Sequence, residues 1–200
     1  MDSISVTSTI FKQAGAENTD TTLQLAYQRA THLGIKTCIV ASSSGKTAVR
    51  ATEILKDLTI IAVTHSYGFK SPNFQELDEE NRKKILAANG HILTCQHALG
   101  GVNRAIRKKF GTYQVDEIIA YTLRLFCQGI KVIAEISMMA ADAGYVQTGI
   151  PIIGIAGSGE GADTAAIIIP TNSQTFFDLN ICEIICFPSP KHPVYTKSYI

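Results

Sequence analysis

The stretch that determines how this chain is interpreted is Cys38-Ile39-Val40-Ala41-Ser42-Ser43-Ser44-Gly45-Lys46-Thr47-Ala48. An apolar, β-branched run stops at three serines and a glycine, and a helical pattern begins directly afterwards. The first N–H groups of a helix have no partners within the helix, and the helix dipole favours negative charge there. The stretch therefore predicts either an anion-binding loop or an ordinary helix that a serine caps.

A P-loop nucleoside triphosphatase is excluded, although Gly45-Lys46-Thr47 matches the end of its motif. The pattern G-x-x-x-x-G-K-[ST] requires glycine where this chain has Val40, inside the expected strand. The next apolar run ends in Thr64-His65 and offers no aspartate that could bind a metal ion.

Composition limits the classes of partner. With 18 basic and 17 acidic residues the net charge is +1, so there is no electrostatic case for nucleic acid. We see no signal peptide and no apolar run that could span a membrane, and we expect a cytoplasmic protein. The five cysteines form no C-x-x-C pair, which argues against a zinc site and for buried thiols in a reducing compartment. We expect no metal site, and self-association as a homo-oligomer stays open.

The order of elements predicts the fold class. Strands are expected over 4–11, 37–41, 58–64, 91–95, 151–156, 165–169 and 181–187, and helices over 19–33, 46–55, 74–88, 102–110, 115–126 and 130–143. Alternation of this kind predicts an α/β protein with three layers, α/β/α, and a mostly parallel sheet. The last two strands leave no room for a helix between them, so we expect a hairpin or an antiparallel edge strand. The domain is expected over residues 1–187, followed by a Pro-rich tail over 188–200.

Two side-chain environments follow from the same patterns. Glu135 shares one side of its helix with Met138 and Asp142, which predicts a solvent-facing stripe. Cys182 and Cys186 share one face of the last strand, which predicts that both are buried.

Ligands of such sheets bind beyond the carboxyl ends of the strands, and four loops are expected there. They are the serine loop over residues 42–45 and the loops over residues 64–69, 97–101 and 157–164. Each combines glycine with hydroxyl, imidazole or carboxylate groups. The candidate binding residues in them are Ser42, Ser43, Ser44, Gly45, Lys46, Thr47, Thr64, His65, Tyr67, Gly68, Phe69, His97, Gly100, Gly101, Gly157, Gly159, Asp163 and Thr164.

Three features of these loops leave alternatives open. His65 and His97 are candidates for acid–base catalysis, or else structural or ligand-contacting residues. Tyr67 and Phe69 could stack on a flat ring or pack the loop onto the domain. Residues 157–162 fit G-x-G-x-x-A, but a strand ended by Pro170 follows where a dinucleotide-binding fold needs a helix. No Ser-His-Asp order with a nucleophile elbow is visible.

Taken together, the motifs resemble the C-terminal α/β domain of pyruvate kinase and a stand-alone family related to it. The resemblance covers about residues 10–187 and rests on these stretches: Gly15-Ala16-Glu17-Asn18-Thr19, Ala41-Ser42-Ser43-Ser44-Gly45-Lys46-Thr47-Ala48, Thr64-His65-Ser66-Tyr67-Gly68-Phe69, His97-Ala98-Leu99-Gly100-Gly101-Val102, Gln128-Gly129-Ile130-Lys131-Val132 and residues 157–164. It implies the three-layer fold and a flavin mononucleotide (FMN) site. The barrel that carries phosphotransfer is not expected here, so the resemblance does not imply pyruvate kinase activity.

Three functional hypotheses remain. The first is an FMN-binding protein, with flavin oxidoreductase activity left open, in which the serine loop would hold the phosphate. The second is a non-enzymatic sensor of a phosphorylated metabolite. The third is an enzyme that acts on a small phosphorylated substrate with His65 or His97 as base.

Overall fold

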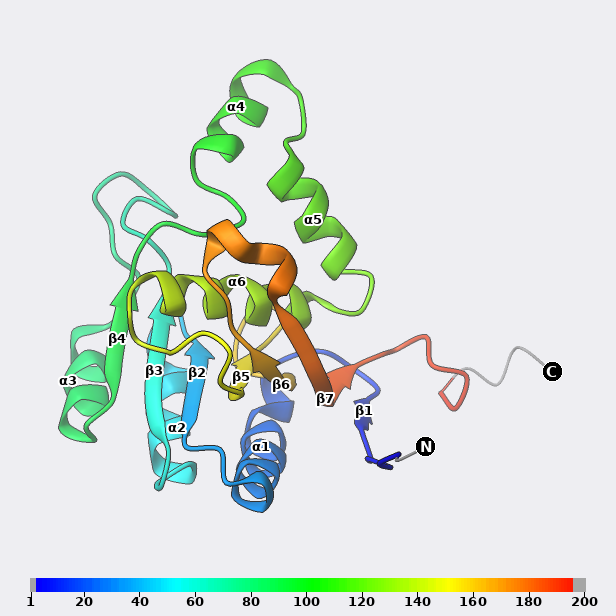
Figure 1. Ribbon diagram of the computed structural model, residues 1–200. Coiled ribbons are helices and arrows are strands. Elements are labelled where there is room, and N and C mark those ends of the chain that lie inside the picture. The colour runs from blue at the N-terminus through cyan, green and yellow to red at the C-terminus, as the bar shows by residue number, and fades with distance from the viewer. Residues whose placement is uncertain (1–2, 196–200) are drawn as a thin grey trace.

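A seven-stranded sheet with the order β1-β7-β6-β5-β2-β3-β4 forms the centre of the computed structural model, which describes residues 3–195 (Figure 1). Its strands are β1 (Thr9–Phe11), β2 (Thr37–Ala41), β3 (Thr59–Thr64), β4 (His91–Thr94), β5 (Ile152–Ala156), β6 (Thr164–Ile169) and β7 (Asn180–Pro188). The α-helices are α1 (Thr19–Leu33), α2 (Lys46–Ile54), α3 (Glu79–Ala87), α4 (Val102–Phe110), α5 (Val115–Leu123) and α6 (Gln128–Asp142), and the 3-10 helices are η1 (Ala16–Asn18) and η2 (Ser173–Asp178). The expected mostly parallel α/β fold is confirmed.

One strand runs against the others. β6 pairs antiparallel with both β5 and β7, whereas β1 pairs parallel with β7 and closes that edge of the sheet. The expected antiparallel pairing of the last two strands is therefore confirmed, and β6 is the third strand from the edge that β1 forms. The short connections on either side of β6 cannot cross the sheet, so each can only return the chain beside the strand it left. This arrangement also confirms that residues 157–162 do not open a dinucleotide-binding βαβ unit.

Alternate residues of the central strands face the two helical layers. On β2, Cys38 and Val40 pack with Leu23 of α1, while Ile39 faces the opposite side and packs with Ile133 of α6. Because both faces are covered, the strands consist almost entirely of apolar residues. The alternation places α1, α2 and α3 on one face and α6 on the other.

Three local predictions need correction. The helix expected over 74–88 begins only at Glu79, where the Asp78 carboxylate accepts the N–H groups of Glu80 and Asn81. A cap of this kind satisfies helix N–H groups that would otherwise lack partners. Residues 74–78 instead complete a long loop after β3.

The solvent-facing stripe on α6 is wrong, because Glu135 and Met138 are buried. Met138 packs with Leu99 and with Ala120 of α5, so a further layer covers the side of α6 that faces away from the sheet. The prediction for Cys182 is also wrong, since its side chain is exposed, whereas Cys186 is buried as expected. All five cysteines are free thiols.

Two segments extend beyond the sheet. In Figure 1, α4 and α5 rise above the end towards which the arrows of β2, β3 and β4 point. This pair of helices exposes apolar side chains, including Val115 at 72% and Phe110 at 70% exposure, whereas most residues of α6 are buried. In the expected tail, the Ser189 N–H donates to Phe11 O and the Tyr195 hydroxyl donates to Ile10 O. Residues 196–200 of that tail lie outside the described residues.

Among the described residues, no helix combines the length and the apolar character needed to cross a bilayer. The same part of the chain contains no group of three or more His, Cys, Asp or Glu side chains that could hold a metal ion.

Candidate functional site

A cleft of about 700 Å³ opens at the carboxyl ends of β2, β3 and β5. Its lining residues come from the exits of these three strands, from the starts of α1, α2 and α6, and from the loop between β3 and α3. They are Ala16, Thr19, Ala41, Ser42, Ser43, Ser44, Lys46, Thr47, Arg50, His65, Lys70, Phe74, Glu76, Gln128, Val132, Gly157, Gly159, Glu160 and Gly161. A cleft of this size is within the range of small-molecule and cofactor sites.

The serine loop lines the cleft and is held by a hydrogen bond to the first turn of α2. Ser42 Oγ accepts the N–H of Ala48 at 3.1 Å, so this serine caps α2 from six residues upstream. Within the described residues, no acceptor takes up the N–H groups of Ser44, Gly45, Lys46 or Thr47. The helix-capping alternative is therefore confirmed for Ser42, and anion binding by the remaining N–H groups stays a prediction.

Gly45 sets the path of this loop. Its φ is 89°, and a Cβ atom there would lie 2.7 Å from Asn81 Cβ and 2.7 Å from Leu77 Cδ1. This position requires glycine, because φ is positive and because Leu77 and Asn81 approach it closely. The Asp78 N–H and the Asn81 amide also donate to Ser44 O, which ties the serine loop to that segment.

The glycine loop over residues 157–161 forms the opposite wall. Gly161 has a φ of 72°, and a Cβ atom there would lie 2.6 Å from Ala16 Cα, so this loop packs tightly against η1. Asp163 is fully buried, and its Oδ2 accepts the N–H groups of Gly15 and Ser158. Its Oδ1 accepts the hydroxyl of Thr164 at 2.7 Å. Asp163 and Thr164 therefore shape the wall from behind rather than line the cleft.

Cationic and anionic groups are mixed around the cleft. Lys46 is exposed, and no ion pair within the described residues holds it, whereas Arg50 is paired with Asp20 and Glu53. Hydrogen bonds from Arg50 to Asp20 raise the pKa of the guanidinium, which stays charged. Lys70 adds a third cation at the rim.

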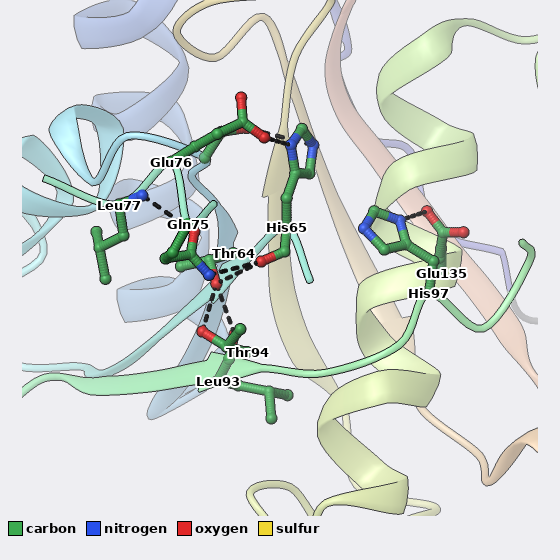
Figure 2. Close-up of polar contacts among 10 residues, drawn as sticks. Thr64, His65, Gln75, Glu76, Leu77, Leu93, Thr94, His97 and Glu135 are labelled. Carbon is green, nitrogen blue, oxygen red and sulfur yellow. Dashed lines mark hydrogen bonds and ion pairs between the residues drawn. The ribbon is translucent and has the colours of Figure 1, made fainter. Parts of the chain in front are cut away.

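His65 connects two other lining residues. Figure 2 shows its imidazole and the Glu76 carboxylate pointing towards each other, with 2.7 Å between Nδ1 and Oε2. On the other side of the ring, Nε2 lies 3.3 Å from Ser43 Oγ. Gln75 supports this arrangement, because its amide donates to His65 O and accepts the N–H of Leu77.

His97 belongs to a separate, buried network behind the cleft. Figure 2 shows it directed at Glu135, with Nδ1 3.6 Å from Oε2. Glu135 also pairs with Lys131 and accepts the N–H of Leu99. Burial by itself would raise the pKa of Glu135, but the contact with His97 and the charge of Lys131 outweigh it and lower that pKa to about 2. Burial also lowers the pKa of Lys131, an effect that Glu135 partly offsets.

Aromatic rings connect the two histidines. Phe69 lies 4.0 Å from the His65 ring and 4.9 Å from the His97 ring, measured between centroids, and Arg104 lies over its other side. Phe69 therefore packs the loop onto the domain, which is one of the two roles expected for it. Tyr67 is exposed at 68% and does not line the cleft.

The structure brings together eight of the residues predicted from the four loops: Ser42, Ser43, Ser44, Lys46, Thr47, His65, Gly157 and Gly159. Ten others do not line the cleft: Gly45, Thr64, Tyr67, Gly68, Phe69, His97, Gly100, Gly101, Asp163 and Thr164. Thr64 is a strand-end residue, since its hydroxyl lies 2.6 Å from that of Thr94 on the neighbouring β4 (Figure 2). The loop over residues 97–101 does not line the cleft, since His97, Gly100 and Gly101 are all outside its lining.

Some lining residues escaped the sequence reasoning. Arg50 lies one helical turn after Lys46, and Val132 lies one turn after Gln128, so the i,i+4 spacing could have indicated both. Phe74 and Glu76 were missed because the segment from residue 74 reads as helix, whereas the structure places it in the loop before α3. Lys70 was missed because no pattern in its own stretch marks it.

The comparison with known families agrees with this architecture. The family model described as pyruvate kinase, alpha/beta domain matches residues 20–168. The match runs from α1 to β6 and includes the serine loop, the His65 loop and the glycine loop.

Proposed function

Starting from the premise that the chain belongs to the pyruvate kinase alpha/beta domain family, we propose that its cleft binds a phosphorylated small molecule, with FMN as the leading candidate. One observation carries the proposal: across residues 3–195 no acceptor takes up the N–H groups of Lys46 and Thr47, and both residues line a cleft of about 700 Å³. A phosphate there would accept hydrogen bonds from the N–H groups of Lys46 and Thr47 and from the serine hydroxyls. The Lys46 ammonium would add a charge-assisted contact.

FMN fits the remaining surfaces of the cleft. Its flat ring needs apolar contacts, and Phe74, Val132 and Ala41 supply them within the lining. Its ribityl hydroxyls need polar partners, which Gln128 and Glu160 can supply. When bound, FMN would supply hydride or single-electron transfer. The residues of this chain would bind its phosphate and orient its ring.

A phosphorylated metabolite other than FMN is the second candidate. The carboxylates of Glu76 and Glu160 line the cleft and are good acceptors for sugar hydroxyls. This feature favours a sugar phosphate, which the chain could sense without chemistry.

Calorimetry with matched ligands tests the proposal. We expect FMN to bind at micromolar concentration and riboflavin, which lacks the phosphate, to bind at least about tenfold more weakly, which corresponds to about 1.4 kcal/mol. Lys46→Met should weaken FMN binding by a similar factor. Lys56→Met is the matched control, because it removes the same charge from an exposed position at the other end of α2.

Two outcomes separate the candidates. A sugar phosphate that stabilises the protein in thermal-shift measurements more than FMN does would favour the metabolite. Equal binding of FMN and riboflavin, unaffected by Lys46→Met, would refute the phosphate site.

A further inference from the structure

We propose that Ser43 is an activated nucleophile, that His65 is its general base, and that Glu76 positions His65, so that the three together hydrolyse a carboxylic ester bound in the cleft. The three side chains form one continuous chain of contacts. Ser43 Oγ lies 3.3 Å from His65 Nε2, and His65 Nδ1 lies 2.7 Å from Glu76 Oε2. A nucleophile, a base within reach of it and a third group that orients the base are the parts that serine hydrolases require.

The tautomer of His65 follows from its partners. Glu76 has only acceptor oxygens when ionised, so its short contact with Nδ1 places a proton on that nitrogen. Nε2 is then the acceptor and faces the hydroxyl of Ser43. The 3.3 Å separation is slightly longer than an ideal hydrogen bond, as is common before substrate binds.

The position of Ser43 in the fold supports the assignment. It lies between β2 and α2, on the connection from a central strand to a helix. The local sequence Ala41-Ser42-Ser43-Ser44-Gly45 matches the nucleophile-elbow pattern G-x-S-x-G around Ser43, with alanine in place of the first glycine. That substitution hid the pattern from a search for the strict motif.

A site for the developing negative charge is also present. No acceptor in the described part of the chain takes up the N–H of Ser44, the residue after the proposed nucleophile, or that of Gly45. In hydrolases with a nucleophile elbow, the N–H of the residue after the serine contributes to the oxyanion hole. Donors already fixed in place before the reaction stabilise the tetrahedral intermediate most effectively.

All three residues line the cleft but come from separate segments. Ser43 follows β2, His65 follows β3, and Glu76 belongs to the loop before α3. Their side chains are accessible, with 31% exposure for His65 and 23% for Glu76, so a substrate and the water for hydrolysis can reach them. The ring of Phe69, 4.0 Å from that of His65 between centroids, and the Gln75 amide bonded to His65 O restrict movement of the base.

The reaction balances with water as the only co-reactant. Ser43 Oγ forms a bond to the ester carbonyl carbon while its proton moves to His65 Nε2. His65 then gives that proton to the departing alkoxide, so the first product is an alcohol and Ser43 carries the acyl group. Water, deprotonated by His65, attacks this acyl group, and the carboxylic acid leaves as Ser43 recovers its proton. The proposal rests on the proposed function in one respect: the anionic end of the ester would bind near Lys46.

Covalent labelling tests the nucleophile without knowledge of the substrate. With diisopropyl fluorophosphate, Ser43 Oγ should form a bond to phosphorus as fluoride leaves. Intact-mass and peptide mass spectrometry should then show one adduct, on Ser43. Ser43→Ala should abolish the adduct, while Ser71→Ala, an exposed serine on the same loop as His65 and Glu76, should leave it unchanged.

The positioning role of Glu76 requires a graded comparison. Glu76→Gln should slow labelling about 100-fold or more, within the range found when acid–base assistance is lost. Glu76→Asp should restore part of that rate, because it returns the carboxylate at a shorter reach. Circular dichroism and thermal melting of each variant show whether the fold is retained. Equal rates for the wild type, Glu76→Gln and Glu76→Asp would remove Glu76 from the mechanism.

Turnover tests the type of bond that is cleaved. The wild type should release one nitrophenolate per chain rapidly from p-nitrophenyl acetate and then continue more slowly, the behaviour expected when an acyl-enzyme accumulates. Cleavage of p-nitrophenyl phosphate without cleavage of the acetate would overturn the ester assignment.

The outcomes also separate this inference from the proposed function. Binding of FMN without any labelling of Ser43 would refute the nucleophile and leave the phosphate site intact. Labelling of Ser43 in a protein that binds neither FMN nor sugar phosphates would support the nucleophile and refute the proposed function.

Discussion

Replacing Glu135 by glutamine should destabilise the protein strongly, because the change leaves the Lys131 ammonium buried without its partner. The Glu135 side chain is 3% exposed and that of Lys131 is 6% exposed. Breaking a buried ion pair by removing one charge costs about 3–5 kcal/mol. The pKa of Glu135 leads to a similar figure, since a lowering from 4.5 to about 2 corresponds to about 3 kcal/mol.

Urea denaturation followed by circular dichroism measures this change in the free energy of unfolding. Glu80→Gln is the matched control, because it breaks an exposed Glu–Lys pair with the same i,i+4 spacing, between Glu80 and Lys84 on α3. Exposed helix pairs contribute about 0.3–0.5 kcal/mol. The double variant Lys131→Met with Glu135→Gln should recover much of the loss, because no charge remains buried.

The same difference should depend on pH. A carboxyl group whose pKa is lower in the folded state stabilises the fold above its unfolded pKa, and the stabilisation is lost as the pH falls through the folded value. The gap between wild type and Glu135→Gln should therefore be full above about pH 4.5 and shrink towards pH 2. A cost for Glu135→Gln no larger than that of Glu80→Gln above about pH 4.5 would refute the reasoning.

Two further changes have definite expected outcomes. Gly45→Ala should lower the melting temperature more than Gly34→Ala does, although both glycines have positive φ, because a Cβ at Gly45 meets Asn81 and one at Gly34 meets nothing within 4 Å; equal losses would contradict this. Iodoacetamide at neutral pH should alkylate the exposed Cys182 long before Cys38, whose pKa burial raises, and Cys182→Ser should remove the fast reaction seen by mass spectrometry.

Much of the fold is predictable from local pattern. The limits of β2 match the expected 37–41 at both ends, because an apolar run bounded by a polar loop marks a buried strand without knowledge of its neighbours. α2 and α4 also begin at the expected residues, after glycines that end the preceding loops. The start of α3 was missed, since the 74–78 segment has helical composition and only its contacts with the serine loop show that it is loop.

The candidate site, like the fold, was predicted correctly only in part. The serine, glycine and His65 loops were expected together because parallel strands bring their carboxyl ends to one edge. The His97 loop was expected with them, but its strand β4 lies at the sheet edge, farther from β5 than β2 and β3 are. Arg50 and Glu76 join the cleft through the positions of their helix and loop, which no strand pattern specifies.

The order of strands and helices and the α/β class follow from the sequence alone, because hydrophobic periodicity is a local property. Anion binding by residues 42–47 was also inferred from local pattern, and it stays a prediction. Only the tertiary structure decided that β6 lies inside the sheet, that Glu135 is buried, and that Ser43, His65 and Glu76 form one chain of contacts. These features depend on residues distant in the sequence, 22 positions apart for Ser43 and His65. Their distances and burial are set by packing, which acts on the whole fold at once.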